Sequence, residues 1–515
     1  MFWQIIAYIL PKVVDFGMFW QIIVYILPKS IFFVPLWQII IFVDMKDNII
    51  GRENEKKQLQ RIYDSGKSEF VAVCGRRRVG KTFLIREFFE DEMVFQTAGL
   101  ANEKTAQQIK SFYTDLVDHG LQPQKEIPKD WIDVFSLLRT LIKQSDSPRK
   151  VILLDELPWM DTPRSKFISA LEHFWNSWAS ARRDIVLVVC GSATSWMMDK
   201  LINNHGGLYN RLTHKIFLRQ FTLLECEDFL VSRGHRLSRY EIAECYMIFG
   251  GVPYYLDLLD KDKSLSQNID NLFFKPKALL SREFPNLYAA LFKNSEGYIT
   301  VVSALCKKRS GLSRKEIIET TGMKSGKGVT TILDNLESCG FIRSYGQYGE
   351  SRKSGVIYQL VDFFTLFYFN FIIKKQIYSW SDLQGKAIFY SWAGLSFEIL
   401  AIQHIFQIKK QLGISGVNSR EYTWRCEDEN KGAQIDLVIE RADNIVNLCE
   451  MKFSVGQFSI DKDYESNLRN KLSKFVEHTK MKKSIQLTLI TTYGLKGNQY
   501  SGVASNQIKL DDMFC

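Results

Sequence analysis

The sequence lacks the cysteine patterns that mark a disulfide scaffold or a zinc site. Its nine cysteines are scattered, with no CxxC pair and no Cys/His spacing typical of zinc ligands. We therefore expect reduced, mostly buried thiols in a cytoplasmic protein. The chain also lacks a strong excess of one charge, because 67 Lys and Arg residues stand against 57 Asp and Glu residues. The net charge of +10 permits an anionic partner such as DNA but does not require one.

The first 44 residues lack an uninterrupted apolar run of membrane-spanning length. A Trp-Gln-Ile-Ile segment recurs there at Trp3, Trp20 and Trp37, and prolines cut the apolar stretches well short of the ~20 residues that a span needs. No basic leader and no small-residue cleavage site of a signal peptide is present. We favour a start codon assigned too early, with Met45 as the true start. An anchoring or interfacial segment stays open, and a membrane partner is expected only in that case.

A phosphate-binding loop is the strongest motif in the chain. Residues 75–82 read GRRRVGKT and match GxxxxGK[ST], between an apolar β-rich run at 70–74 and a helical pattern at 83–89. In such loops the backbone N–H groups wrap the phosphates, the lysine reaches the outer phosphates and the hydroxyl ligates Mg²⁺. The predicted cofactor-binding residues are Gly75, Arg76, Arg77, Arg78, Val79, Gly80, Lys81 and Thr82.

Two further apolar runs end in polar residues that complete this site. The run at 150–154 is followed by Asp155 and Glu156, which we assign to the Mg²⁺ shell and to the general base that activates water. The run at 185–190 precedes Ser192, a candidate sensor of the γ-phosphate. Lys81, Glu156 and Ser192 are thus predicted catalytic residues, and Thr82 and Asp155 are predicted metal ligands.

With these three blocks in place, the chain resembles the archaeal-type ATPases of the AAA+/STAND group of P-loop proteins, from about Ile49 onward. The resemblance implies ATP and Mg²⁺ as cofactors and ATP hydrolysis as the activity. It places Gly51 and Arg52 in a box beside the nucleotide base, and Pro253 in the motif that closes the ATPase core. It implies that Arg211 is directed at phosphate, although Arg219 and the Arg182-Arg183 pair are alternatives.

The middle of the chain predicts a winged helix, which resembles the one that follows the ATPase core in this family. Helices are expected at 298–306, from Ser313 onward and at 328–338, with Ser313 and Glu316 forming a capping box. Strands are expected at 339–342 and 355–360. The third helix either enters the major groove of DNA or only relays the nucleotide state, and both readings stay open.

The C-terminal part carries an acid on one predicted strand and an acid-x-lysine on the next. Asp436, Glu450 and Lys452 have this spacing, and Glu398 lies on a helix upstream. The pattern resembles the PD-(D/E)xK nuclease core, in which carboxylates can share a second Mg²⁺ or an Mn²⁺. We expect the four side chains to converge on one side of a small mixed sheet.

Together these features predict an α/β protein with a parallel-sheet P-loop ATPase core and helical lid, a winged helix and an α/β nuclease-like domain. The expected boundaries are 1–44 for the leader, 45–258 for the core, 259–362 for lid and winged helix, and 363–515 for the last domain. The predicted function is ATP hydrolysis that gates the C-terminal module on DNA. The alternative is a non-nucleolytic switch or DNA-binding regulator that acts through a protein partner. A homo-oligomer is left open.

Overall fold

The structure is a computed structural model that describes residues 49–192, 194–202, 208, 210–292, 294–308, 310–349, 355–373, 379–426 and 432–515. The repeated N-terminal segment and the expected start at Met45 lie outside the described residues. Tyr209, in the segment that carries Arg211, lies outside them as well.

The N-terminal part is built on a parallel five-stranded sheet with strand order β2-β3-β4-β1-β5. Strands β1, β3 and β4 are buried along their whole length, which explains why each reads as an unbroken apolar run. The strands are β1 (Glu69–Cys74), β2 (Met93–Ala98), β3 (Lys150–Asp155), β4 (Ile185–Gly191) and β5 (His214–Phe217). The predicted α/β class with a parallel sheet is confirmed.

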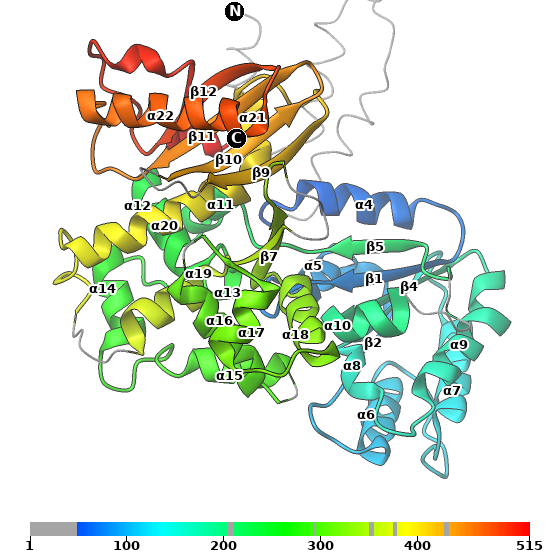
Figure 1. The fold of residues 1–515 in the computed structure, drawn as a ribbon. Helices are drawn as coiled ribbons and strands as arrows, with labels where there is room; N and C mark the ends of the chain where they lie inside the picture. Colours follow the sequence, from blue (N-terminus) through cyan, green and yellow to red (C-terminus); the bar gives the residue numbers. More distant parts are fainter. Residues whose placement is uncertain are drawn as a thin grey trace, which may run out of the picture. The chain divides into compact units, whose positions relative to one another are not determined.

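Helices lie around this sheet (Figure 1), and the apolar side chains of several of them form one core with those of the strands. They are α4 (Glu53–Tyr63), α5 (Lys81–Phe88), α6 (Thr105–Asp118), α7 (Trp131–Gln144), α8 (Leu157–Met160), α9 (Phe167–Ser177) and α10 (Thr194–Met197). Helix α5 begins at Lys81, within the last two residues of the motif, so the loop joins β1 to α5. This connection between strand and helix is the one that the motif predicts.

A helical region and a small antiparallel sheet follow. The helices are α11 (Leu223–Ser232), α12 (Arg239–Phe249), α13 (Pro253–Leu256), α14 (Leu265–Ile269), α15 (Glu283–Leu291), α16 (Glu296–Lys307), α17 (Arg314–Thr321) and α18 (Lys327–Ser338). Strands β6 (Leu312–Ser313), β7 (Ile342–Gly346) and β8 (Val356–Leu360) pair in the order β6-β8-β7. The expected capping box is present, since the Ser313 and Glu316 side chains each accept the other's backbone N–H. The elements match the expected helices and strands within a few residues, and the winged-helix assignment stays a prediction.

The C-terminal part is a mixed five-stranded sheet between two layers of helices. Strands β9 (Ser419–Cys426), β10 (Ala433–Arg441) and β11 (Ile445–Lys452) are antiparallel, and β12 (Ser484–Thr491) and β13 (Asn506–Lys509) continue in parallel. Its helices are α19 (Phe363–Phe367), α20 (Ala387–Gln403), α21 (Ile405–Gln411) and α22 (Lys462–Thr479). One face of the sheet packs with α20 and the other with α22.

The hydrophobic cores show which parts are joined. One continuous core runs from α11 through the small antiparallel sheet to α20 and the C-terminal sheet, whereas the helices on the parallel sheet enclose a separate core. The region beyond the parallel sheet is therefore held together largely by shared apolar packing.

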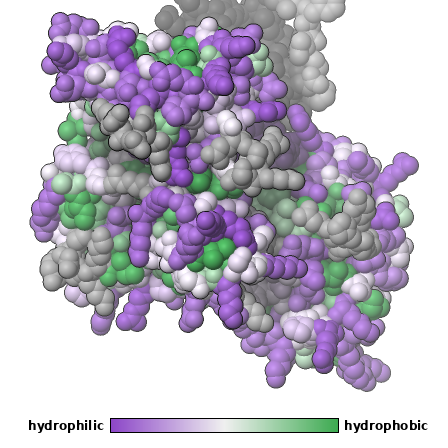
Figure 2. Space-filling view, in the orientation of Figure 1, coloured by the Kyte–Doolittle hydropathy of each residue, from purple (hydrophilic) through white to green (hydrophobic). Residues whose placement is uncertain are grey.

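Hydrophilic side chains predominate on the face shown in Figure 2, and hydrophobic ones form small separate groups there. Among the described helices, none combines the length and the hydropathy that crossing a bilayer requires.

Candidate nucleotide site

The loop at 75–82 is shaped by two glycines with different roles. A Cβ at Gly75 would lie 2.4 Å from the carbonyl oxygen of Leu218, so no larger residue fits there without movement. Gly80 has a φ of 89° and caps the N-terminus of α5, a left-handed conformation that glycine adopts at low cost. The loop therefore delivers the backbone directly into the first turn of a helix, where N–H groups are free for an anion.

Lys81 is buried and folded back over this loop. Its Nζ donates to the carbonyl oxygens of Gly75 and Arg76, at 3.0 Å each. Burial lowers the pKa of Lys81, while the negative charge of Glu156 opposes the shift. The ammonium thus lies at the start of α5, close to the two acids that follow β3.

Thr82 and Asp155 meet across the site. The Thr82 hydroxyl donates to Asp155 Oδ2 at 2.5 Å, and the backbone N–H of Glu156 donates to Asp155 Oδ1 at 2.8 Å. Both residues lie at the carboxyl edge of the parallel sheet, the edge at which such sheets bind ligands. A hydroxyl and a carboxylate are hard oxygen donors, so this pair fits the preferences of Mg²⁺.

Glu156 and Ser192 form the second contact at this edge. The Ser192 hydroxyl lies 3.0 Å and 2.9 Å from the two carboxylate oxygens of Glu156. Glu156 has a φ of 43°, a left-handed conformation that non-glycine residues adopt at a cost. We predicted Ser192 as a phosphate sensor; in the structure its hydroxyl contacts the predicted base.

Arg52 links the Gly51-Arg52 segment to the phosphate-binding loop. Its guanidinium donates to the carbonyl oxygen of Val79 at 3.1 Å and lies 4.5 Å from the ring centre of Phe221. Its backbone N–H donates to Glu225 at 2.8 Å, and a Cβ at Gly51 would collide with the same Glu225 side chain. Sequence reasoning missed Glu225, although Thr222 and Glu225 form a capping box that the sequence displays.

The residues of this site lie in a part of the chain that is similar to a known family of domains. Residues 49–259 match the family model described as an ATPase domain predominantly from Archaea. Residues 49–259 are an ATPase domain of the archaeal P-loop type.

Beyond the ATPase domain match, the chain is similar to two uncharacterised proteins of Methanocaldococcus jannaschii. MJECL04 is 25% identical over 400 residues, which cover 76% of this chain and 84% of that protein. MJ0423, described as an ATP-binding protein, is 37% identical over 46 residues, which cover 9% of this chain and 78% of MJ0423.

Two solved structures are also similar to the chain. The Walker-type ATPase paby2304 of Pyrococcus abyssi shows 17% identity and a TM-score of 0.48, and the match covers 63% of this chain and 97% of that one. The ORC2 protein of Aeropyrum pernix, solved in ADPNP-ADP complexes, shows 14% identity and a TM-score of 0.39, with 64% and 97% covered.

Two arginines of the ATPase domain's loop point away to carboxylates outside the domain. Arg76 is buried and forms an ion pair with Asp362, and Arg78 forms one with Glu283. We predicted that Arg76, Arg77 and Arg78 bind the cofactor; as the structure stands, the first and third guanidiniums are already engaged, and only Arg77 is exposed. The long sequence separation of these pairs leaves no local pattern that could have revealed them.

Two further predicted residues of the ATPase domain are Pro253 and Arg211. Pro253 is the first residue of α13, and the next residue, Tyr254, lies under Arg78, with 4.1 Å from the guanidinium carbon to the ring centre. Arg211 is exposed in the turn before β5. The roles of Pro253 and Arg211 toward a nucleotide stay predictions.

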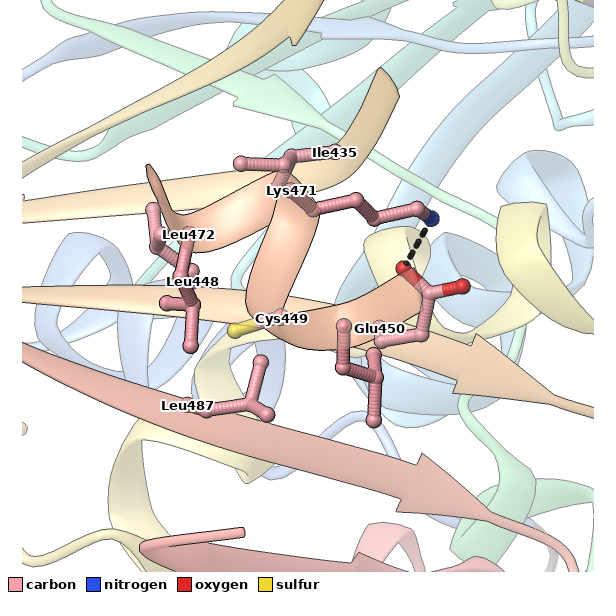
Figure 3. A pocket seen from close by; sticks show the side chains of 8 residues that line it. Ile435, Leu448, Cys449, Glu450, Lys471, Leu472 and Leu487 are labelled. Carbon is pink, nitrogen blue, oxygen red and sulfur yellow. Dashed lines mark hydrogen bonds and ion pairs between the residues drawn. The ribbon is translucent and has the colours of Figure 1, made fainter. Parts of the chain in front are cut away.

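Outside the ATPase domain, the C-terminal sheet brings most of its predicted cluster together. Glu450 is buried and pairs with Lys452 at 3.2 Å and with Lys471 at 2.7 Å, as Figure 3 shows for Lys471. The Tyr464 hydroxyl donates to the same carboxylate at 3.1 Å. Tyr464 and Lys471 come from α22 and were not predicted, because only the packing of α22 on the sheet brings them to Glu450.

The electrostatics of this cluster are dominated by burial and by two lysines. Burial, and then the charge of Glu450, raises the pKa of Asp436 to about 6. Burial also acts to raise the pKa of Glu450, but Lys471 and Lys452 outweigh it and the net shift is downward. Burial acts to lower the pKa of Lys452, but the charges of Glu450 and Asp436 outweigh it, and the charge of Glu398 acts in the same upward direction. Among the described residues, no three His, Cys, Asp or Glu side chains are grouped so that they could hold a metal ion.

Proposed function

We propose that the ATPase domain binds ATP with Mg²⁺ and hydrolyses it, and that the nucleotide state is passed to the region beyond residue 259. The observation that carries this proposal is the contact of Thr82 with Asp155 at 2.5 Å, directly beside Glu156 and Lys81. A hydroxyl from the loop and a carboxylate from β3 meet where a metal bound to phosphates would need them.

In the proposed reaction each residue has a separate task. Thr82 and Asp155 would hold Mg²⁺, which when bound offsets negative charge on the phosphates. Lys81 exchanges its bonds to backbone carbonyls for bonds to the outer phosphates. Glu156 accepts a proton from the attacking water, and the Ser192 hydroxyl orients the carboxylate that does so.

Transmission of the nucleotide state rests on the two arginine ion pairs. Asp362 caps α19 by accepting from the backbone N–H of Thr365 at 2.9 Å, and Glu283 opens α15. Both helices belong to the continuous core that extends to the C-terminal sheet. A rearrangement of the loop on nucleotide binding would therefore shift α15 and α19. Because both helices pack into that core, the shift would reach the rest of it.

The small antiparallel sheet with α16, α17 and α18 serves in this proposal as a winged helix that relays the signal. The C-terminal sheet serves as a ligand-binding module without resident metal. Both carboxylate oxygens of Glu450 are taken by Lys452, Lys471 and Tyr464, so these residues do not fit a divalent cation as they stand. This observation favours the switch over a nuclease.

Steady-state ATP turnover of the full chain tests the enzymatic part. Lys81→Ala is expected to reduce turnover by about 10²-fold or more, since it removes the cation that supports the outer phosphates. Lys57→Ala, an exposed lysine on α4, is the control and is expected to behave as wild type. Undiminished turnover in Lys81→Ala would contradict the proposal.

Hydrogen exchange tests the transmission. A non-hydrolysable ATP analogue is expected to change amide protection over β8 and α19 in wild type, and Arg76→Gln is expected to abolish this response. Arg86→Gln removes the same charge from an exposed position on α5 and is expected to retain it. An unchanged response in Arg76→Gln would show that the coupling runs elsewhere.

A further inference from the structure

A cleft of about 390 Å³ lies where the small antiparallel sheet meets the C-terminal sheet. The two sheets are joined there by backbone contacts: Gln347 bridges Thr423, and the Tyr348 N–H donates to the Thr423 carbonyl at 2.9 Å. Figure 1 shows β7 reaching toward β9 at this junction. Strand β7 supplies one wall of the cleft, and β9 and β10 supply the other.

Arg343 of β7 brings a positive charge into this cleft. Its Nε donates to Gln359 at 2.8 Å, and its guanidinium lies 4.6 Å from the ring centre of Tyr345. Across the parts of the chain that the structure describes, no carboxylate forms an ion pair with it. Burial lowers its pKa to about 10, as expected for a cation removed from water without a counter-ion. An anionic ligand would supply the missing partner.

The rest of the lining suggests what carries that anion. Tyr345 and Tyr422 offer aromatic rings, and Ile402 and Ile405 add an apolar surface. Ser344 presents an exposed hydroxyl, and Asp436 lies on the β10 wall. The acidic Glu421 is paired with Lys409, so its charge is already offset. A cleft with one cation, aromatic rings and apolar side chains suits a phosphate joined to a planar base better than a bare phosphate.

We propose that this cleft binds a nucleotidyl phosphate, either as a free nucleotide or within a single strand of nucleic acid. Arg343 contacts the phosphate, and the base lies against Tyr345 or Tyr422 toward Asp436. The proposal deepens the proposed function, because it rests on the assignment of the C-terminal sheet as a ligand-binding module. It requires neither a metal ion at Glu450 nor ATP hydrolysis.

Fluorescence anisotropy of the full chain with labelled oligo(dT) of about 12 nucleotides tests this site, with saturating ADP present to fill the ATPase domain. Arg343→Gln is expected to weaken binding about tenfold, the effect of one lost charge-assisted hydrogen bond. Ser344→Glu places a negative charge at an exposed position in the cleft and is expected to weaken binding by a similar factor. Arg420→Gln removes an exposed arginine of β9 outside the cleft and is expected to bind within about twofold of wild type.

Competition with thymidine monophosphate distinguishes the two sources of the phosphate. If the monophosphate displaces the oligonucleotide, the cleft accepts a free nucleotide; if it does not, the cleft recognises the strand. Three results would overturn the proposal. They are no binding by wild type, wild-type affinity in both Arg343→Gln and Ser344→Glu, and a loss of affinity in Arg420→Gln as large as that in Arg343→Gln. Ser344→Glu keeps the test valid if Arg343→Gln does not fold. ATP turnover measured on the same samples separates this failure from a failure of the ATPase assignment.

Discussion

Two pairs of acids, one in the ATPase domain and one in the C-terminal sheet, are both flanked by lysine but differ in their partners. Asp155 and Glu156 accept from hydroxyls and a backbone N–H, while the nearby Lys81 donates to carbonyl oxygens. Glu450 is instead held directly by two ammonium groups. Neutral donors leave the charge of a carboxylate available to a cation, whereas ammonium partners cancel it. The first pair therefore fits the Mg²⁺ site that we propose, whereas the charge of Glu450 in the second pair is already offset.

The largest expected difference between the two sites is in turnover. Glu156→Gln removes the proposed general base and is expected to reduce ATP turnover by about 10²–10⁴-fold with nucleotide binding retained. Glu450→Gln makes the same chemical change in the C-terminal sheet and is expected to leave turnover unchanged. Steady-state hydrolysis and equilibrium binding of a labelled nucleotide measure both. Equal losses in the two variants would show that the second cluster takes part in the reaction.

The next effect concerns the stability of the C-terminal cluster. Lys471→Met removes one of the two cations from buried Glu450 and is expected to destabilise the protein by about 3 kcal/mol, at the lower end for a broken buried pair because Lys452 remains. Combining it with Glu450→Gln is expected to recover much of that loss, since the buried carboxylate charge that Lys471 offsets is then removed as well. Urea denaturation measures both. Lys462→Met, on the exposed side of α22, is the control, and a loss there of equal size would exclude a specific role for Lys471.

The difference between these acids also shows what sequence alone can reveal. The loop at 75–82, Asp155 and Glu156 were predictable because each motif is contiguous and follows a strand that is buried on both faces. The partners of Arg76 and Arg52 were not, because Asp362 and Glu225 are 286 and 173 residues away in sequence. Likewise, Asp436 and Glu450 were found by spacing, but Tyr464 and Lys471 reach Glu450 only through the packing of α22. Local patterns thus located the candidate site residues, whereas the contacts that set their charge state arise from tertiary structure.

A pH titration sharpens the comparison further. Asp436 has a pKa raised from 3.8 to about 6, so the folded state holds a proton that the unfolded state releases. Its contribution to stability is therefore present below pH 3.8 and falls as the pH rises toward and past 6. Asp436→Asn cannot ionise, so it is expected to gain stability relative to wild type as the pH is raised through this window. Urea midpoints for both proteins at several pH values test this, and parallel curves would contradict it.

The smallest effect is expected from Ser192, and it distinguishes two roles for the same hydroxyl. If Ser192 positions Glu156, as their contacts at 2.9 Å and 3.0 Å suggest, Ser192→Ala should lower turnover about tenfold, the value of one hydrogen bond to a charged group. Nucleotide affinity should not change, because the hydroxyl acts through the base, and Ser192→Thr should restore turnover. A phosphate sensor would behave differently: Ser192→Ala would then weaken ATP binding relative to ADP binding.

The double variant of Ser192→Ala with Glu156→Gln also distinguishes the two roles, because a positioning hydroxyl then has no base left to orient. If Ser192 positions Glu156, Ser192→Ala should cause no additional loss of turnover in the Glu156→Gln variant. If Ser192 senses phosphate, Ser192→Ala should cause a further loss of turnover there.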